Sequence, residues 1–168
     1  MRRLLVQCLA GFLVALIAGS VTTGYAFARR VHSSICGAVV PADIALTNVS
    51  LGAFNSNNTS DSSVQCSMIE DNSLDAVSVT AIEVQVGDGS TSGSVVASAC
   101  YVEETALSGS CGTSDASSNG GTGADTLTPP DWDSISGYDI GDFAFINVVL
   151  CDNGDPGPCS VRGYRVSS

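Results

Sequence analysis

The sequence predicts an all-β fold, an antiparallel β-sandwich of jelly-roll or Greek-key type with disulfide bonds. Short runs of β-branched residues alternate with Gly, Ser, Asn and Asp, a pattern typical of strands joined by turns. After residue 28, no stretch places apolar residues at helical spacing among good helix formers. Because the terminal strands of a sheet must be paired or covered, a two-sheet sandwich is the natural arrangement.

The first 28 residues are predicted to be a secretory signal peptide. A positive start with Arg2 and Arg3 precedes an apolar run over residues 4–17, and an Ala-Phe-Ala sequence ends at Ala28. This order is typical of a cleavable export signal. Cleavage after Ala28 leaves residues 29–168 as a single disulfide-stapled domain, secreted or periplasmic. An uncleaved N-terminal anchor is the alternative.

Six stretches are strand candidates. They cover residues 44–54, 64–69, 76–86, 94–103, 143–151 and 161–166. The longest, 76–86, changes its apolar side between Val79 and Ile82, which indicates a bulge or burial on both faces. Gly and Asp in residues 87–90 indicate a turn.

Residues 112–126 differ from the rest of the chain. They are rich in Gly, Ser, Thr and Asn and contain almost nothing to bury. We expect a flexible surface loop within the domain. We expect ordered structure to resume after this loop, at Pro129, Pro130 and Trp132.

Six cysteines remain after the predicted cleavage, and an even number in an exported chain indicates a disulfide framework. The six cysteines are Cys36, Cys66, Cys100, Cys111, Cys151 and Cys159. Free buried thiols are the less favoured alternative to disulfides. A local pattern pairs neighbours along the chain, 36–66, 100–111 and 151–159. A nested pattern keeps 36–66 and joins 100–151 and 111–159, and is slightly favoured because it ties two strand candidates together.

The charge excludes several partners. The chain has 17 acidic residues against six Arg and no Lys, a net charge of −11. Without residues 1–28, four Arg oppose the same 17 acids, a net charge of −13. Nucleic-acid binding needs clustered cations, and anionic membranes repel such a surface. Because no Lys or Arg lies between Arg30 and Arg162, we expect that internal salt bridges do not neutralise the acids, which must be solvated, metal-bound or hydrogen-bonded to the backbone.

The sequence offers little for catalysis, and we predict that the protein is not an enzyme. His32 is the single histidine and lies near the predicted N-terminus, where chains fray. Without Lys, Ser-Lys and Schiff-base mechanisms are excluded. A small carboxylate-dependent glycoside hydrolase is an alternative, whereas solvated surface acids explain the same residues. The candidate pairs are Glu70 with Asp71, Glu103 with Glu104, and Asp131 with Asp133.

Calcium is the metal that the acidic turns fit best, although no cofactor is predicted. Hard oxygen ligands occur there beside Gly, without the spacing of an EF-hand loop, and plain turns explain the same residues. The candidate ligands are Asp139, Asp142, Asp152, Asn153 and Asp155.

Four aromatic residues are candidates for stacking on a sugar ligand, with burial in the core as the favoured alternative. They are Tyr101, Trp132, Tyr138 and Tyr164. We predict a non-enzymatic binding or structural/interaction module with a glycan or protein partner. A calcium-dependent carbohydrate-binding module is the alternative.

The C-terminal sequence and the order of features before it resemble a group of uncharacterised secreted bacterial proteins. The resemblance is carried by residues 160–166, by Cys36 soon after the export signal, and by strand cysteines at Cys66, Cys100 and Cys151. It implies export from a Gram-negative bacterium and a β-sandwich, with no site residues. Because those proteins often keep only these four cysteines, it favours the nested pairing, with Cys111 and Cys159 as an added bridge.

Overall fold

The computed structural model describes residues 28–38, 46–49, 52–55, 61–68, 75–106, 108–118, 122–139, 141–151 and 158–168. The predicted signal peptide lies outside this part of the chain, apart from Ala28. All helical segments in the described part are single turns of 3₁₀ helix, and the fold is all-β as predicted.

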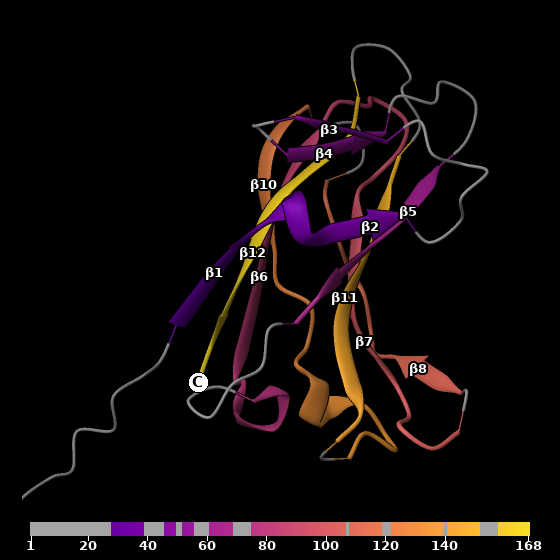
Figure 1. Cartoon of the computed structure of the whole chain (residues 1–168). Helices are drawn as coiled ribbons and strands as arrows, with labels where there is room; N and C mark the ends of the chain where they lie inside the picture. The colour runs from indigo at the N-terminus through magenta and orange to yellow at the C-terminus, as the bar shows by residue number, and fades with distance from the viewer. Residues whose placement is uncertain are drawn as a thin grey trace, which may run out of the picture.

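Two six-stranded antiparallel sheets pack face to face as a sandwich. The first has the order β10-β6-β12-β4-β3, with β1 also paired to β12; the second has the order β2-β5-β11-β7-β8, with β9 also paired to β7. In Figure 1, β6, β10 and β12 lie on the left and β7, β8 and β11 on the right. From β5 onward, the longer strands alternate between the two sheets.

The strand bounds are as follows. The first sheet contains β1 (Ala28–His32), β3 (Leu46–Val49), β4 (Gly52–Asn55), β6 (Ala81–Asp88), β10 (Gly123–Leu127) and β12 (Ser160–Ser167). The second contains β2 (Cys36–Ala38), β5 (Ser62–Ser67), β7 (Val96–Val102), β8 (Gly109–Cys111), β9 (Asp115–Ala116) and β11 (Phe143–Leu150).

The core forms where the inward faces of the sheets meet. β6 and β11 alternate between inward and outward side chains, and the inward ones are apolar except for Asp88 at the end of β6. Trp132 is completely buried, and its indole N–H donates to the Cys100 carbonyl at 2.8 Å. The Tyr164 hydroxyl of β12 donates to the Ser67 carbonyl of β5 at 2.7 Å, which ties one sheet to the other.

Side chains cap three turns of 3₁₀ helix. Asp75 and Asp131 accept the Ser78 and Ser134 backbone N–H groups and so begin the turns Ala76–Ser78 and Trp132–Ser134. His32 Nδ1 accepts the Ser34 N–H in the same way for Ser33–Ile35. In the two Asp caps, a backbone N–H group donates to the carboxylate, which is one of the three environments expected for the acids of this chain.

Several expected elements differ from the observed ones. Residues 44–54 contain the paired strands β3 and β4 instead of one run. The apolar switch near Val79 comes from a 3₁₀ turn that ends before β6 starts, so neither the predicted bulge nor the alternative, burial on both faces, is found there. The structure places a register shift in β12 instead, between Val161 and Gly163.

The N-terminal strand β1 is a further difference, because fraying was expected there. β1 pairs with the C-terminal strand β12 over its whole length. Gly163 opposes His32 in this pairing, and a Cβ at this position would collide with the Val31 carbonyl oxygen. Glycine therefore permits the two terminal strands to approach.

The segment 112–126, predicted as a loop with nothing to bury, contains two paired strands. β9 pairs with β7, and β10 pairs with β6 along its five residues. Ser117 between them is buried. A Gly- and Ser-rich composition hid these strands because their stability comes from pairing with edges of longer strands rather than from their own apolar side chains.

The disulfides follow the local pattern, Cys36–Cys66, Cys100–Cys111 and Cys151–Cys159. The slightly favoured nested pairing is therefore wrong, whereas Cys36–Cys66 is confirmed. Cys36 opposes Cys66 across β2 and β5, and Cys100 opposes Cys111 across β7 and β8, with Cα atoms 4.0 Å apart in both pairs. These two bridges hold short outer strands onto the second sheet. The third joins the end of β11 to the start of β12 and so links the two sheets.

Candidate functional site around Asp88 and the Cys151–Cys159 disulfide

A buried carboxylate ends the central strand β6. Ile82, Val84 and Val86 point into the core, and Asp88 continues this inward row two residues further on. Only 5% of Asp88 is exposed. A buried acid is costly unless its oxygens receive hydrogen bonds, so the groups around Asp88 decide whether the strand can end this way.

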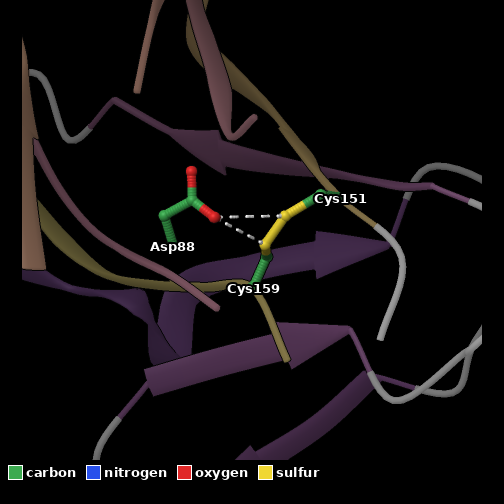
Figure 2. Close-up of side chains that lie close together, drawn as sticks. All are labelled: Asp88, Cys151 and Cys159. Carbon is green, nitrogen blue, oxygen red and sulfur yellow. Dashed lines mark hydrogen bonds between the residues drawn. A yellow bond between two sulfur atoms is a disulfide. The ribbon is translucent and has the colours of Figure 1, made fainter. Parts of the chain in front are cut away.

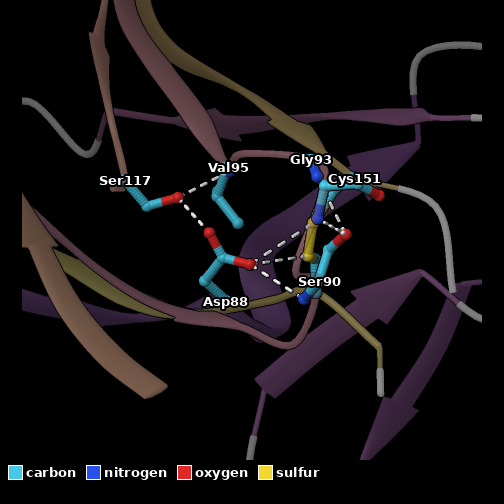
Figure 3. The surroundings of a disulfide bond; sticks show 8 residues. Asp88, Ser90, Gly93, Val95, Ser117 and Cys151 are labelled. Atoms are coloured by element: carbon cyan, nitrogen blue, oxygen red, sulfur yellow. Dashed lines mark hydrogen bonds between the residues drawn. A yellow bond between two sulfur atoms is a disulfide. The ribbon is translucent and has the colours of Figure 1, made fainter. Parts of the chain in front are cut away.

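Two donors from different segments satisfy this carboxylate, as Figure 3 shows. The Ser90 backbone N–H donates to Oδ1 at 2.9 Å, and the Ser117 hydroxyl donates to Oδ2 at 2.5 Å. Both serines are buried. In the described part of the chain, no buried side-chain nitrogen or oxygen lacks a hydrogen-bond partner.

Ser117 is itself held in place by Val95. Its hydroxyl oxygen accepts the Val95 N–H at 2.8 Å (Figure 3). Its own N–H donates to the Val95 carbonyl at 2.9 Å. The hydroxyl hydrogen is therefore directed at Asp88. This is the structural role of the Ser-rich segment after β9, where the sequence indicated only a loop.

The Cys151–Cys159 disulfide lies directly against the same carboxylate (Figure 2). Asp88 Oδ1 is 3.8 Å from Cys151 Sγ and 3.6 Å from Cys159 Sγ. Both cysteines are buried. The turn 90–93 closes over them; a Cβ on Gly93 would come within 2.9 Å of the Cys151 Cβ, which favours glycine there.

A polar cavity of about 270 Å³ reaches this centre from the side of β10. Asp88 and Ser117 line it together with Ser118 and residues 122–125. The carboxylate therefore has a route to solvent even though it is buried.

The centre places one carboxylate against a disulfide and does not form a catalytic triad. Asp88 Oδ1 and the two sulfurs lie within 4.8 Å of one another. The Ser117–Asp88 pair resembles two members of a hydrolase triad, but a triad needs an imidazole beside the serine. The single histidine, His32, lies in β1, where its Nδ1 accepts the Ser34 N–H.

The structure describes two of the five candidate calcium ligands. Asp142 Oδ1 accepts the Glu104 N–H at 3.3 Å, and its Oδ2 accepts the Asp139 N–H at 3.0 Å. Backbone N–H groups thus use both oxygens of Asp142, as a plain acidic turn does. Asp152, Asn153 and Asp155 lie outside the described residues.

The four aromatic candidates do not form an exposed stacking face. Tyr101, Trp132 and Tyr164 are buried in the core. Tyr138 is half-buried and packs edge-on against Tyr101, with ring centroids 5.6 Å apart. Burial in the core, the favoured alternative, is what the structure shows for these three rings, and the hydroxyl or indole N–H of each donates inside the protein.

The described residues of the candidate acid–base pairs lie in a 3₁₀ turn and directly after a strand. Asp131 caps a 3₁₀ turn, and Asp133 is exposed within that turn. Glu103 and Glu104 directly follow β7. Glu70 and Asp71 lie outside the described residues.

An exposed apolar patch lies on the outer face of the second sheet. Phe143 of β11 is 64% exposed, and its register partner Val102 of β7 is 37% exposed. Half-buried Phe145 lies two residues along the same face. A groove of about 390 Å³ runs beside these residues, and Gln65, Ser67, Met68 and Ala144 also line it. We call Val102, Phe143 and Phe145 the outer patch.

Acidic residues border this patch. Glu103 and Glu104 follow Val102, and Asp142 precedes Phe143. The hydrogen bond from the Glu104 N–H to Asp142 shows that the two acidic segments meet at the same end of the sheet. The patch therefore combines an apolar centre with a negative rim.

Sequence reasoning missed Asp88, Ser117 and Phe143. For Asp88 the signal was present, since positions 82, 84, 86 and 88 form one period-two row. For Ser117 no signal existed, because its partner is 29 residues away in sequence.

Comparison of the chain with known protein families, with curated proteins and with solved structures finds no match. The resemblance to secreted bacterial proteins therefore stays a prediction. Among the described residues, no helix has the length and hydropathy needed to cross a membrane.

Proposed function

We propose that this protein is an exported, non-enzymatic β-sandwich module that binds a protein partner through the outer patch. The exposure of Phe143 carries this proposal. Outward positions on the neighbouring strand β5 are polar, Gln65 and Ser67, as expected for a solvated sheet face. A contiguous aromatic and aliphatic patch on such a face is typical of an interaction site.

The rim defines the chemistry of the partner. Glu103, Glu104 and Asp142 place negative charge around an apolar centre, which fits a partner surface with an apolar side chain surrounded by Lys or Arg. Because these acids are near the surface, the association is expected to weaken as salt concentration rises.

Export is supported by the three disulfides, which persist in oxidising compartments. A non-enzymatic role is supported by the use of Asp75, Asp131 and Asp142 as backbone hydrogen-bond acceptors. These carboxylates stabilise local structure instead of facing one another across a cleft.

The test measures how much partner protein is captured by the disulfide-bonded wild-type protein and by two serine variants. Wild-type protein is cross-linked to the secreted and envelope proteins of its source, and partners are quantified by mass spectrometry. Phe143→Ser is expected to reduce capture of the specific partner by at least about tenfold, the loss for an interface hot spot. Val77→Ser is the matched control, because Val77 is 39% exposed but lies in the 3₁₀ turn before β6.

The rim is tested separately. Glu103→Gln combined with Glu104→Gln is expected to weaken capture at low salt and to flatten its salt dependence. Capture that is equal for wild type and Phe143→Ser, or that falls equally for Val77→Ser, would exclude the outer patch as the binding surface.

A further inference from the structure

We propose that the partner of the outer patch is a second copy of this chain, which binds through an Arg face on its first sheet, so that copies associate head to tail. The Arg face consists of Arg30 of β1 and of Arg162 and Arg165 of β12. This inference rests on the proposed function, because it names the partner of the same patch.

The basic residues outside residues 1–28 all lie on two paired strands. They are Arg29 and Arg30 in β1 and Arg162 and Arg165 in β12, and the chain has no Lys. β1 and β12 lie side by side in the first sheet (Figure 1). The strands of the second sheet contain no basic residue, so the positive charge is confined to one side of the sandwich.

The Arg face points away from the core. Arg30 lies directly opposite Arg165, and Arg165 lies opposite Glu83 of β6, an outward position between the buried Ile82 and Val84. Arg162 reaches the same face, because a Cβ on the outward Gly87 would lie 3.8 Å from one of its guanidinium nitrogens. The three guanidinium groups therefore share the outer surface of the first sheet.

Two of these groups are available to a partner. Arg165 forms an ion pair with Glu83 at 3.4 Å, whereas Arg30 and Arg162 form no ion pair with any described residue. Asp125 of β10 lines a groove beside Arg162, and its carboxylate accepts the Thr126 N–H.

Like charges placed directly opposite each other destabilise a pair of strands. Arg30 and Arg165 are such a pair, with Glu83 bonded to only one of them. The pairing of these two cations thus contributes nothing favourable to the fold, and carboxylates from another molecule would relieve their repulsion.

The outer patch carries the complementary chemistry. Glu103, Glu104 and Asp142 border Phe143, and carboxylates are the groups that Arg binds best. An exposed aromatic ring also binds a guanidinium group over its face. Ile35, which is 38% exposed in the 3₁₀ turn directly after β1, adds an apolar side chain at the end of the Arg-bearing strand.

The two surfaces lie on the outer faces of opposite sheets, so one copy cannot bind its own Arg face with its own patch. Each copy instead presents one patch and one Arg face to two different neighbours. Such a head-to-tail contact uses different surfaces on the two molecules and generates rings or open chains. Species larger than a dimer are therefore expected as concentration rises.

The net charge of the chain sets the salt dependence. Copies with a large negative charge repel one another at long range, and this repulsion is screened beyond about 10 Å at roughly 0.1 M salt. Contacts between Arg and carboxylate groups at the interface persist there and weaken toward roughly 1 M. Association is thus expected to be strongest near the lower concentration.

The experiment is sedimentation velocity on the exported, disulfide-bonded protein over a dilution series at both salt concentrations. The face variant, Arg30→Glu with Arg162→Glu, and the rim variant, Glu103→Arg with Glu104→Arg, are each expected to lower the association constant at least about a hundredfold, since like charges then meet. An equimolar mixture of the two variants is expected to restore association, because opposite charges face each other again.

Two further variants serve as references. Phe143→Ser is expected to weaken association at least about tenfold, the loss for an interface hot spot. Asp61→Arg changes charge in the same sense as the rim variant, but it precedes β5 at the end of the sheet where Ser62 opposes Leu150, far along β11 from Phe143. It is expected to leave association unchanged.

Thermal unfolding followed by Trp132 emission establishes that each variant is folded. Arg30→Gln with Arg162→Gln, which removes charge without reversing it, replaces the face variant if that one unfolds, and is expected to weaken association at least about tenfold.

The outcomes separate this inference from the proposed function. A wild-type protein that stays monomeric, while Phe143→Ser still loses capture of another protein, would overturn self-association and leave the patch as a binding site. Self-association that Phe143→Ser does not weaken, or that the mixed variants do not restore, would overturn the head-to-tail contact. A monomeric wild type that binds an anionic polysaccharide through Arg30 and Arg162 would assign the Arg face to that ligand and overturn the inference.

Discussion

The Asp88 centre and the outer patch reverse the ordinary distribution of side chains in opposite ways. Asp88 is a charged group in the inward row of β6, where the three preceding residues are Ile82, Val84 and Val86. Phe143 starts the outward row of β11, on a face whose neighbouring strand presents polar residues. In each strand the alternation of side chains decides the face, so that Asp88 points inward and Phe143 points outward in spite of their polarity.

The difference lies in what the fold itself supplies. Asp88 is tolerated because Ser90 and Ser117 donate to it from two other segments, so removing it should damage folding. Phe143 receives little from the fold and stabilises it little. Hydrogen-bond donors within the protein thus explain the buried Asp88. The exposed Phe143 has no such internal explanation and indicates a binding partner.

Replacing Asp88 is expected to have the largest effect on stability. Asp88→Ala leaves the Ser90 N–H and the Ser117 hydroxyl without acceptors inside the protein, and each such group costs roughly 1–3 kcal/mol. We expect a loss of about 3 kcal/mol in the free energy of unfolding, measured by urea denaturation with Trp132 emission. Asp88→Asn, which keeps one carbonyl oxygen for Ser90, is expected to lose less than half as much. Equal losses would mean that the hydrogen bonds are not what holds the centre.

Removing the bridge beside Asp88 is expected to come next. Cys151 and Cys159 are separated by 8 residues. Chain entropy alone then predicts a loss of about 2.5 kcal/mol for Cys151→Ala with Cys159→Ala. Cys100→Ala with Cys111→Ala is the matched control, since its separation of 11 residues gives almost the same entropy. The shorter loop alone makes the loss at 151–159 about 0.3 kcal/mol smaller than at 100–111, so a loss that is smaller by more than about 1 kcal/mol would contradict the chain-entropy estimate.

The smallest effect is expected at the outer patch. Phe143→Ser should change the free energy of unfolding by less than about 0.5 kcal/mol, because surface substitutions away from caps and buried networks rarely do more. The same urea titration measures it, beside Val77→Ser. A loss above about 2 kcal/mol would show that Phe143 packs as a core residue and would remove the contrast with Asp88.

The strongly apolar strands were predictable from the sequence. β6 and β11 carry β-branched residues at period two, and β7 and β12 carry Val among other apolar residues, so that their own burial stabilises them. β1, β9 and β10 were missed, since they are stabilised by partners distant in the chain. β8 was missed as well, because this short, exposed strand is stabilised by pairing with the preceding strand β7. β10, for example, has four exposed residues out of five and exists because β6 offers it an edge.

The cysteine pairing could not be predicted from the sequence for a related reason. Both candidate patterns satisfied the count of six, and nothing in the spacing revealed that β8 turns back onto β7 directly after it. Once Cys111 lies opposite Cys100 in that pair, the local bridge is the one within reach. The charge was informative in part. N–H and O–H groups satisfy Asp88, as expected where no Lys or Arg lies between Arg30 and Arg162. Glu83 of β6 instead forms an ion pair with Arg165 of β12 at 3.4 Å, which corrects the expectation that no internal salt bridge reaches the acids.

By itself, the sequence determined the all-β class and the disulfide-stapled character, because these follow from composition and from side-chain periods within single strands. The tertiary structure alone decided the sulfur pairing, the burial of Tyr101, Trp132 and Tyr164, and the meeting of Asp88 with Ser117 and two cysteines. Each of these depends on which distant strands become neighbours, and contacts of that kind arise from packing two sheets together rather than from any local pattern.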